Sequence, residues 1–236
     1  MELSQMKIKW VAFRTNYSFN DLVQSFLYNQ YSQANERGFV LTRANDKLIL
    51  GKHVVKTLQK ESVEDPFGGH FEREYTVFET VEFELSAERP NSLKLKNPPR
   101  KLKLFLQDFL HICGFRSMVS EIKVDCLGVV SFLESKGLKC QVTQMDLEGV
   151  PISDDSTASL TLKGVGDVRS SIQNILPGKS VKAKKLSVLI GIDGERCSSV
   201  IASTGLFLLN PRGEFPLSSL EVLLYESLLG KFLVSN

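Results

Sequence analysis

Two groups of basic side chains are the residues of this sequence whose type and spacing most clearly favour a chemistry. The first group surrounds a Pro-Pro step and consists of Lys94, Lys96, Arg100, Lys101 and Lys103. The second lies in "GKSVKAKK" before an expected strand and contains Lys179, Lys182, Lys184 and Lys185. Ammonium and guanidinium groups at this density bind phosphate oxygens without reading a base sequence. We therefore predict that the first group binds nucleic acid, with Lys182, Lys184 and Lys185 as the second choice.

The overall charge of the chain shows that this basicity is local. The chain has 236 residues, with 29 basic and 27 acidic side chains and a formal net charge of +2. It is not a polycation, so nucleic-acid binding depends on the clusters alone. An equally weighted alternative is that these lysines keep exposed sheet edges soluble and prevent edge-to-edge pairing.

Two patterns raise catalytic alternatives. Glu121-x-Lys123 on an expected strand, with Asp108 thirteen residues earlier, is a spacing that metal-dependent nucleases use to hold Mg²⁺. Asp108 falls on an expected helix, however, and not on a strand. In "LTLKGVGDVRSS", Gly164-x-Gly166 lies between an expected strand and an expected helix, as in a phosphate-binding turn, but Arg169 takes the place of the third glycine.

The metal-ligating and nucleophilic residues form no motif. The histidines are far apart at positions 53, 70 and 111, and the cysteines at 113, 126, 140 and 197 contain no C-x-x-C pair. We expect buried, reduced thiols of a cytoplasmic protein. The sequence shows no signal peptide and no apolar run of the ~18–20 residues that a membrane span needs. We assign no catalytic residue, no metal ligand, no cofactor and no membrane partner, and an enzyme is not the expected class.

The first half, residues 1–115, is expected to be an α+β unit that ends in the basic strand and helix. The expected order is a strand, a helix that opens with a Ser18/Asp21 capping box, a hairpin, further strands and a final helix. Residues 59–72 contain turn formers with little periodicity, which predicts a long mobile loop. In the strand at 92–96 the leucines are expected to face inward, with Lys94 and Lys96 facing outward. A helix is expected to begin at Arg100, after Pro98-Pro99.

The second half, residues 116–236, has the expected order β-α-β-β-α-β-β-α, and Asp193-Gly194 gives its strongest turn signal. This order is typical of a ferredoxin-like unit. The predicted fold class is therefore α+β: mixed, mainly antiparallel sheets with helices packed on one face. The chain would form two related halves, of which the second is ferredoxin-like.

The order of elements resembles that of the RexA phage-exclusion proteins and of the DNA-binding B component of the Kiwa anti-phage system. The resemblance lies in "GFVLTRANDKLIL", in "STASLTLKGVGDVRSSIQNIL" and in "LSVLIGIDGERCSSVIASTGLF" followed by "LEVLLYESLLGKFL". It implies a homodimer that binds double-stranded DNA in phage defence. No site residue is carried over from it.

The leading hypothesis is a non-catalytic protein that binds nucleic acid, and DNA in particular, without sequence specificity. The alternative is a protein–protein interaction module, such as an assembly subunit or an inhibitor of a larger complex, supported by the apolar C-terminal helix and the segment at 59–72. A Mg²⁺-dependent nuclease ranks third.

Overall fold

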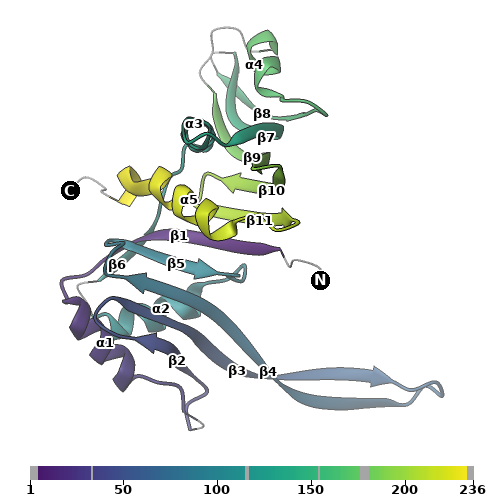
Figure 1. Cartoon of the computed structure of the whole chain (residues 1–236). Helices are drawn as coiled ribbons and strands as arrows, with labels where there is room; N and C mark the ends of the chain where they lie inside the picture. Colours follow the sequence, from purple (N-terminus) through teal and green to yellow (C-terminus); the bar gives the residue numbers. More distant parts are fainter. Residues whose placement is uncertain (1–4, 33, 115–116, 154, 176–180, 233–236) are drawn as a thin grey trace. The chain divides into compact units, whose positions relative to one another are not determined.

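The computed structural model describes residues 5–32, 34–114, 117–153, 155–175 and 181–232, and it shows a mixed α+β fold (Figure 1). The described residues form eleven strands and five helices, and the paired strands are mainly antiparallel. The predicted α+β class with mainly antiparallel strands is therefore confirmed. The chain divides into two units: unit 1 comprises Met1–Ala12 and Ser120–Asn236, and unit 2 comprises Phe13–Val119. The first strand thus joins the C-terminal half of the sequence.

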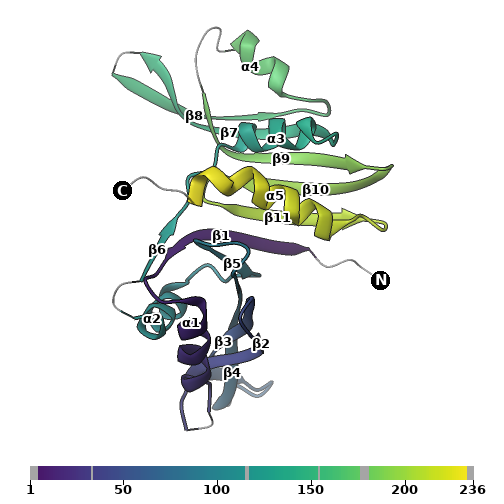
Figure 2. The same cartoon turned by 60° about the vertical axis from the view of Figure 1, so that its left-hand side comes forward.

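Unit 1 is built on an antiparallel sheet with the strand order β1-β11-β10-β9-β7-β8. The strands that lie wholly or partly in this unit are β1 (Met6–Arg14), β6 (Met118–Glu121), β7 (Lys139–Ser153), β8 (Ser156–Lys163), β9 (Lys182–Ile192), β10 (Glu195–Ala202) and β11 (Leu206–Arg212). Two of its helices, α3 (Cys126–Ser135) and α5 (Leu217–Phe232), lie on one face of the sheet, and a short helix, α4 (Arg169–Ile175), follows β8 (Figure 2).

The core of unit 1 lies between that sheet and the two helices. Trp10 of β1 packs edge-to-face on Phe207 of β11, with ring centroids 5.2 Å apart. Leu220, Leu224 and Leu228 of α5 are fully buried because helical spacing places them on one face. One face of the C-terminal helix is therefore a core element, whereas Val222 and Leu229 of the same helix are exposed. In the described part of the chain, no helix is long and apolar enough to cross a membrane.

Unit 2 contains four antiparallel strands in sequence order: β2 (Arg37–Ala44), β3 (Leu48–Glu64), β4 (His70–Ser86) and β5 (Ser92–Lys96). Two helices, α1 (Phe19–Tyr28) and α2 (Lys103–Ile112), pack against this sheet. Five phenylalanines join the helices to the strands, with ring centroids 5.2 to 6.4 Å apart: Phe26, Phe39, Phe83, Phe105 and Phe109. The predicted capping box at the start of α1 is confirmed, since Ser18 accepts from the Asp21 N–H and Asp21 from the Ser18 N–H.

The prediction of a mobile loop at residues 59–72 is wrong. Strands β3 and β4 pair in one uninterrupted register from Leu48↔Ser86 to Glu64↔His70. At the tip, Asp65 Oδ1 accepts from the N–H groups of Phe67 and Gly69, both at 2.8 Å. The sequence signal failed because neither face of this ribbon is buried, so no selection for alternating polar and apolar residues shapes it. We call the part of the hairpin from Lys56 to Glu79 the arm.

Candidate nucleic-acid interface

The basic segment, residues 96–103, connects β5 to α2 and contains four of the five cations predicted to bind nucleic acid. Arg100, Lys101 and Lys103 are exposed, and Lys96 is half-buried. The ion pairs of unit 2 involve other residues, and within the described part of the chain no carboxylate is within ion-pair distance of these four side chains. Glu82 lies opposite Lys96 in the β4–β5 register without forming an ion pair. The four charges are therefore available to an external anion.

Helix α2 begins directly in the basic segment, at Lys103, three residues later than predicted. Its N-cap residue is Leu102, which provides no side-chain acceptor, and the first turn contains no acid. The first backbone N–H groups of a helix have no partner within the helix, and they carry the positive end of its dipole. The missing cap thus adds to the positive potential of the neighbouring side chains.

Lys94 requires a correction, because it does not point into solvent as the alternating pattern predicted. It is only 5% exposed and forms an ion pair with Glu84, which faces it across the β4–β5 ladder. Arg89 also approaches Glu84, with 3.6 Å between Nη1 and Oε1. A buried ammonium group needs a charged partner to offset its lost hydration. Lys94 therefore serves the fold of unit 2 and does not present its charge to a ligand.

The second lysine group lies in unit 1 and is largely paired with acids of β7. Lys184 Nζ is 3.2 Å from Glu148 Oε1, and Lys185 Nζ is 3.5 Å from Asp146 Oδ2. The amide of Gln144, the hydroxyl of Thr161 and Lys185 together hold the pKa of Asp146 below its usual range. Lys182 is exposed, and Lys179 lies outside the described residues. Of this group, Lys182 alone keeps an uncompensated charge among the described residues.

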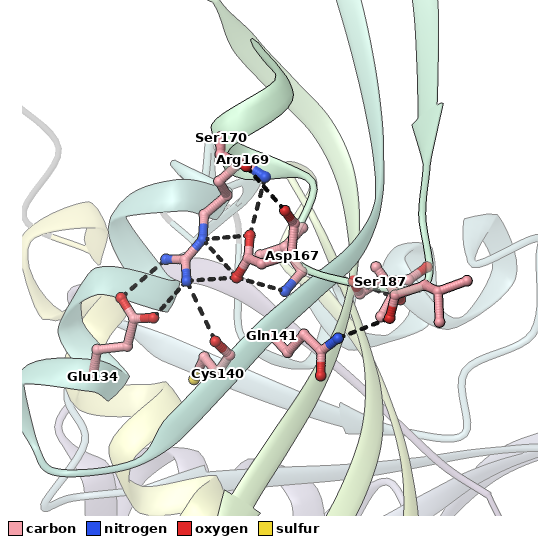
Figure 3. Close-up of polar contacts among 10 residues, drawn as sticks. Glu134, Cys140, Gln141, Asp167, Arg169, Ser170 and Ser187 are labelled. Atoms are coloured by element: carbon pink, nitrogen blue, oxygen red, sulfur yellow. Dashed lines mark hydrogen bonds and ion pairs between the residues drawn. The ribbon is translucent and has the colours of Figure 1, made fainter. Parts of the chain in front are cut away.

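The glycine turn before α4 is occupied by the side chain of Asp167 (Figure 3). Asp167 Oδ1 accepts from the Arg169 N–H at 3.0 Å, and Oδ2 accepts from the Val142 N–H at 3.3 Å. Partial burial raises the pKa of Asp167, but hydrogen bonds from Arg169 and from these two N–H groups hold it below its usual range. The protein's own carboxylate thus takes the amides that a phosphate would need.

Arg169 is bound on the other side by α3. Its Nη1 and Nη2 donate to the two carboxylate oxygens of Glu134 at 3.0 and 2.7 Å, and Nη2 also reaches the carbonyl of Cys140 at 3.3 Å (Figure 3). The Asp167 and Glu134 carboxylates raise the pKa of the guanidinium. With all three nitrogens engaged, Arg169 ties β7, α3 and α4 together and has no role for an external anion.

The acids of the nuclease pattern have internal partners and belong to different units. Glu121, in unit 1, accepts from Lys9 Nζ at 2.6 Å. Asp108, in unit 2, has its Oδ2 2.8 Å from His53 Nε2 and 3.5 Å from Arg37 Nε. Across the described ranges, no three His, Cys, Asp or Glu side chains are grouped so that they could hold a metal ion.

The cysteines are free thiols, and Cys113, Cys126 and Cys197 are buried as predicted, whereas Cys140 is half-buried. Burial raises the pKa of Cys113 and of Cys126 to about 12. Thiols this far from ionisation at neutral pH are poor nucleophiles.

The His53–Asp108 pair is the polar feature that the sequence did not reveal. The two residues are 55 positions apart, and no local motif links a strand histidine to a helix aspartate. Asp108 borders a hollow of about 510 Å³ whose polar lining includes Asn29, Gln30, Arg37 and His111. Comparison with known proteins adds no assignment, since neither the protein-family models nor the curated proteins give a match.

Proposed function

We propose that this chain is a non-catalytic, cytoplasmic protein that binds nucleic acid, principally double-stranded DNA, without sequence specificity. One observation carries this assignment. In a chain with a formal net charge of only +2, Lys96, Arg100, Lys101 and Lys103 form a continuous segment beside an uncapped helix terminus, and described carboxylates do not neutralise them. Such a surface attracts phosphates and makes no contact that would distinguish bases.

The setting proposed for this activity is phage defence, which rests on the resemblance in element order to RexA and the Kiwa B component. Duplex DNA offers one phosphate charge per ~1.7 Å of helix axis, so closely spaced cations can each neutralise a phosphate. Lys182 is the remaining candidate from the second lysine group. Lys94, Lys184 and Lys185 contribute less, because their charges are already balanced inside the protein.

The test is the salt dependence of binding to a short duplex of arbitrary sequence. If the four cations neutralise four phosphates, the slope of log K against log salt is about −3.6, and affinity falls roughly 150-fold between 50 and 200 mM salt. The variant R100Q/K101Q/K103Q retains one of these contacts and should show a slope of about −0.9. The matched control is K184Q/K185Q, which removes two lysines that already have acidic partners and should leave the slope nearly unchanged.

Binding that is absent at 50 mM salt would refute the assignment. So would a slope that R100Q/K101Q/K103Q leaves at the wild-type value. If K184Q/K185Q lowers the slope as much as the triple substitution does, the basic segment is not the interface. A second duplex of unrelated sequence should bind with the same affinity, because phosphate contacts carry no base information.

A protein–protein interaction module is the second candidate function, and the arm is the observation that favours it. Several of its apolar side chains are exposed, including Phe67, which is 97% exposed at the tip. Purification separates the two functions. A preparation whose ratio of absorbance at 260 to 280 nm drops after a high-salt wash had carried nucleic acid, whereas a protein that copurifies without nucleic acid would support the interaction module.

A further inference from the structure

The arm is a two-stranded ribbon that leaves the rest of the unit 2 sheet. The register of β2 with β3 ends at Val55, and that of β5 with β4 begins at Glu82. Between these limits, β3 and β4 pair with no other strand among the described residues, although the Lys56 N–H still donates to the Glu36 carbonyl at 2.7 Å. Figure 1 shows the ribbon extending beyond the other strands of unit 2. An isolated two-stranded hairpin is at best marginally stable in water, so an arm of this length gains from a partner.

Large apolar side chains are exposed along the arm. The exposed fractions are 39% for Tyr75, 52% for Phe71, 55% for Phe78 and 66% for Leu58. Tyr75 and Phe71 share one face of the ribbon, since their numbers differ by an even step, whereas Phe78 and Leu58 lie on the other. Exposed large apolar side chains gathered on one element favour a protein partner. Between residues 56 and 79 the arm carries three basic and six acidic side chains, which disfavours nucleic acid as its ligand.

The outer edge of β4 from His70 to Val81 is the longest edge that lacks a partner strand in the described part of unit 2. Unpaired edges are templates for another strand. The charged side chains on this edge, apart from its terminal histidine, are Glu72, Arg73, Glu74 and Glu79. Arg73 and Glu79 have no ion pair within the described residues. Both point to the Tyr75 face, because all three positions have the same parity.

We propose that the partner is a second copy of this chain, and that the two β4 edges pair antiparallel about a two-fold axis at Thr76. A two-fold axis perpendicular to the ribbon requires that paired positions add up to twice the number of the central residue. Among such registers of β4, the one centred on Thr76 alone sets opposite charges against each other, with Arg73 facing Glu79 of the other copy twice. Centres at 72, 73, 74 or 79 oppose like charges.

Two further features agree with this register. It pairs positions 71 to 81 and stops where β5 takes over the edge at Glu82, so it uses nearly the whole free strand. It also sets Tyr75 against Val77 and Phe71 against Val81 of the other copy, which covers the apolar residues of that face. The outer edge of β3 offers less, because its one register that sets opposite charges against each other without also opposing like charges is centred on Ser62 and spans only five residues.

Cross-linking tests the axis directly, with Thr76→Cys as the probe and Thr80→Cys as its matched control. Directly opposed residues in an antiparallel pair have Cα atoms about 4.5–5.5 Å apart, which suits a disulfide. Residue 80 of one copy would lie on the order of 27 Å from residue 80 of the other. Both threonines are exposed on β4. On oxidation with copper–phenanthroline, T76C should form a disulfide-linked dimer, whereas T80C and the parent chain should remain monomeric on a non-reducing gel.

Charge reversal tests the register in the unmodified chain by analytical ultracentrifugation. E79R sets arginine against Arg73 at two symmetric positions and should raise the dimer Kd by about tenfold or more. Adding R73E should restore much of the affinity, since the opposed charges are then exchanged. E72R makes the same charge change opposite Thr80 and should have little effect. A monomer at tens of micromolar, or equal cross-linking of T76C and T80C, would overturn the dimer. Neither result depends on nucleic-acid binding.

Discussion

Asp108→Ala should destabilise the protein more than its partly exposed position suggests. The imidazole of His53 is 1% exposed, between Phe39 and Phe105, and its Nε2 is 2.8 Å from Asp108 Oδ2. Because a carboxylate can only accept, this nitrogen carries the proton of the hydrogen bond. Removing the carboxylate leaves a buried donor without that acceptor.

The expected loss in the free energy of unfolding is about 2–3 kcal/mol. A buried donor without its partner costs roughly 1–3 kcal/mol. The ion pair with Arg37 adds at most about 0.5 kcal/mol, since the Arg37 side chain is 56% exposed. Asp108→Asn keeps an acceptor oxygen and should lose only about 1 kcal/mol. His53→Phe suits the surrounding aromatic cluster, and it leaves Asp108 with Arg37 and water, so its loss should also be about 1 kcal/mol.

Urea unfolding followed by far-UV circular dichroism measures these differences, provided that the m-values agree among variants. In the double variant H53F/D108A no buried donor remains, so its loss should be smaller than the sum of the single losses by about 1 kcal/mol or more. Hydrogen exchange at the amides of β3 should report the same order of variants. Additivity within roughly 0.5 kcal/mol would show that the hydrogen bond contributes nothing specific, and the reasoning from burial would be wrong.

Two further predictions concern unit 1. The pKa of Asp167 is lower in the folded state than in the unfolded state, where it is near 3.8. Its contribution to stability is therefore fully present above pH 3.8 and is lost as the pH falls through the lower pKa of the folded state. D167N should accordingly flatten the acid limb of a plot of melting temperature against pH. Gly205 has φ +75°, and a Cβ there would lie 2.6 Å from the carbonyl oxygen of Trp10. G205A should therefore lower the stability by well over the ~1 kcal/mol expected for the control G137A, because the left-handed position of Gly137 has open space around it. Thermal melts monitored by Trp10 fluorescence measure both losses. A loss for G205A no larger than that for G137A would contradict this steric explanation.

The sequence predicted the fold class because the buried elements carry clear periodicities. Helix α1 shows both its capping box and its apolar face, and Asp193-Gly194 joins β9 to β10 with positive φ values of 49° and 89°. The arm was missed because exposed strands have no such pattern. That the two halves are related, and that the second is ferredoxin-like, remains a prediction.

The ion-pair partner of each lysine could not be predicted from the sequence, because the register of antiparallel strands brings together residues that are far apart in the sequence. Lys94 meets Glu84 across β4–β5, and Lys185 meets Asp146 across β7–β9. The same rule explains why part of the first lysine group is available. Arg100 and Lys101 follow Pro98-Pro99 in a connection without a neighbouring strand, so no ladder brings a carboxylate opposite them. Pairing in a ladder does not neutralise every cation, since Lys96 and Lys182 face Glu82 and Glu148 without forming an ion pair. In the connection beside the start of α2, no described strand brings a carboxylate opposite Arg100 and Lys101, so their charges stay available to a ligand.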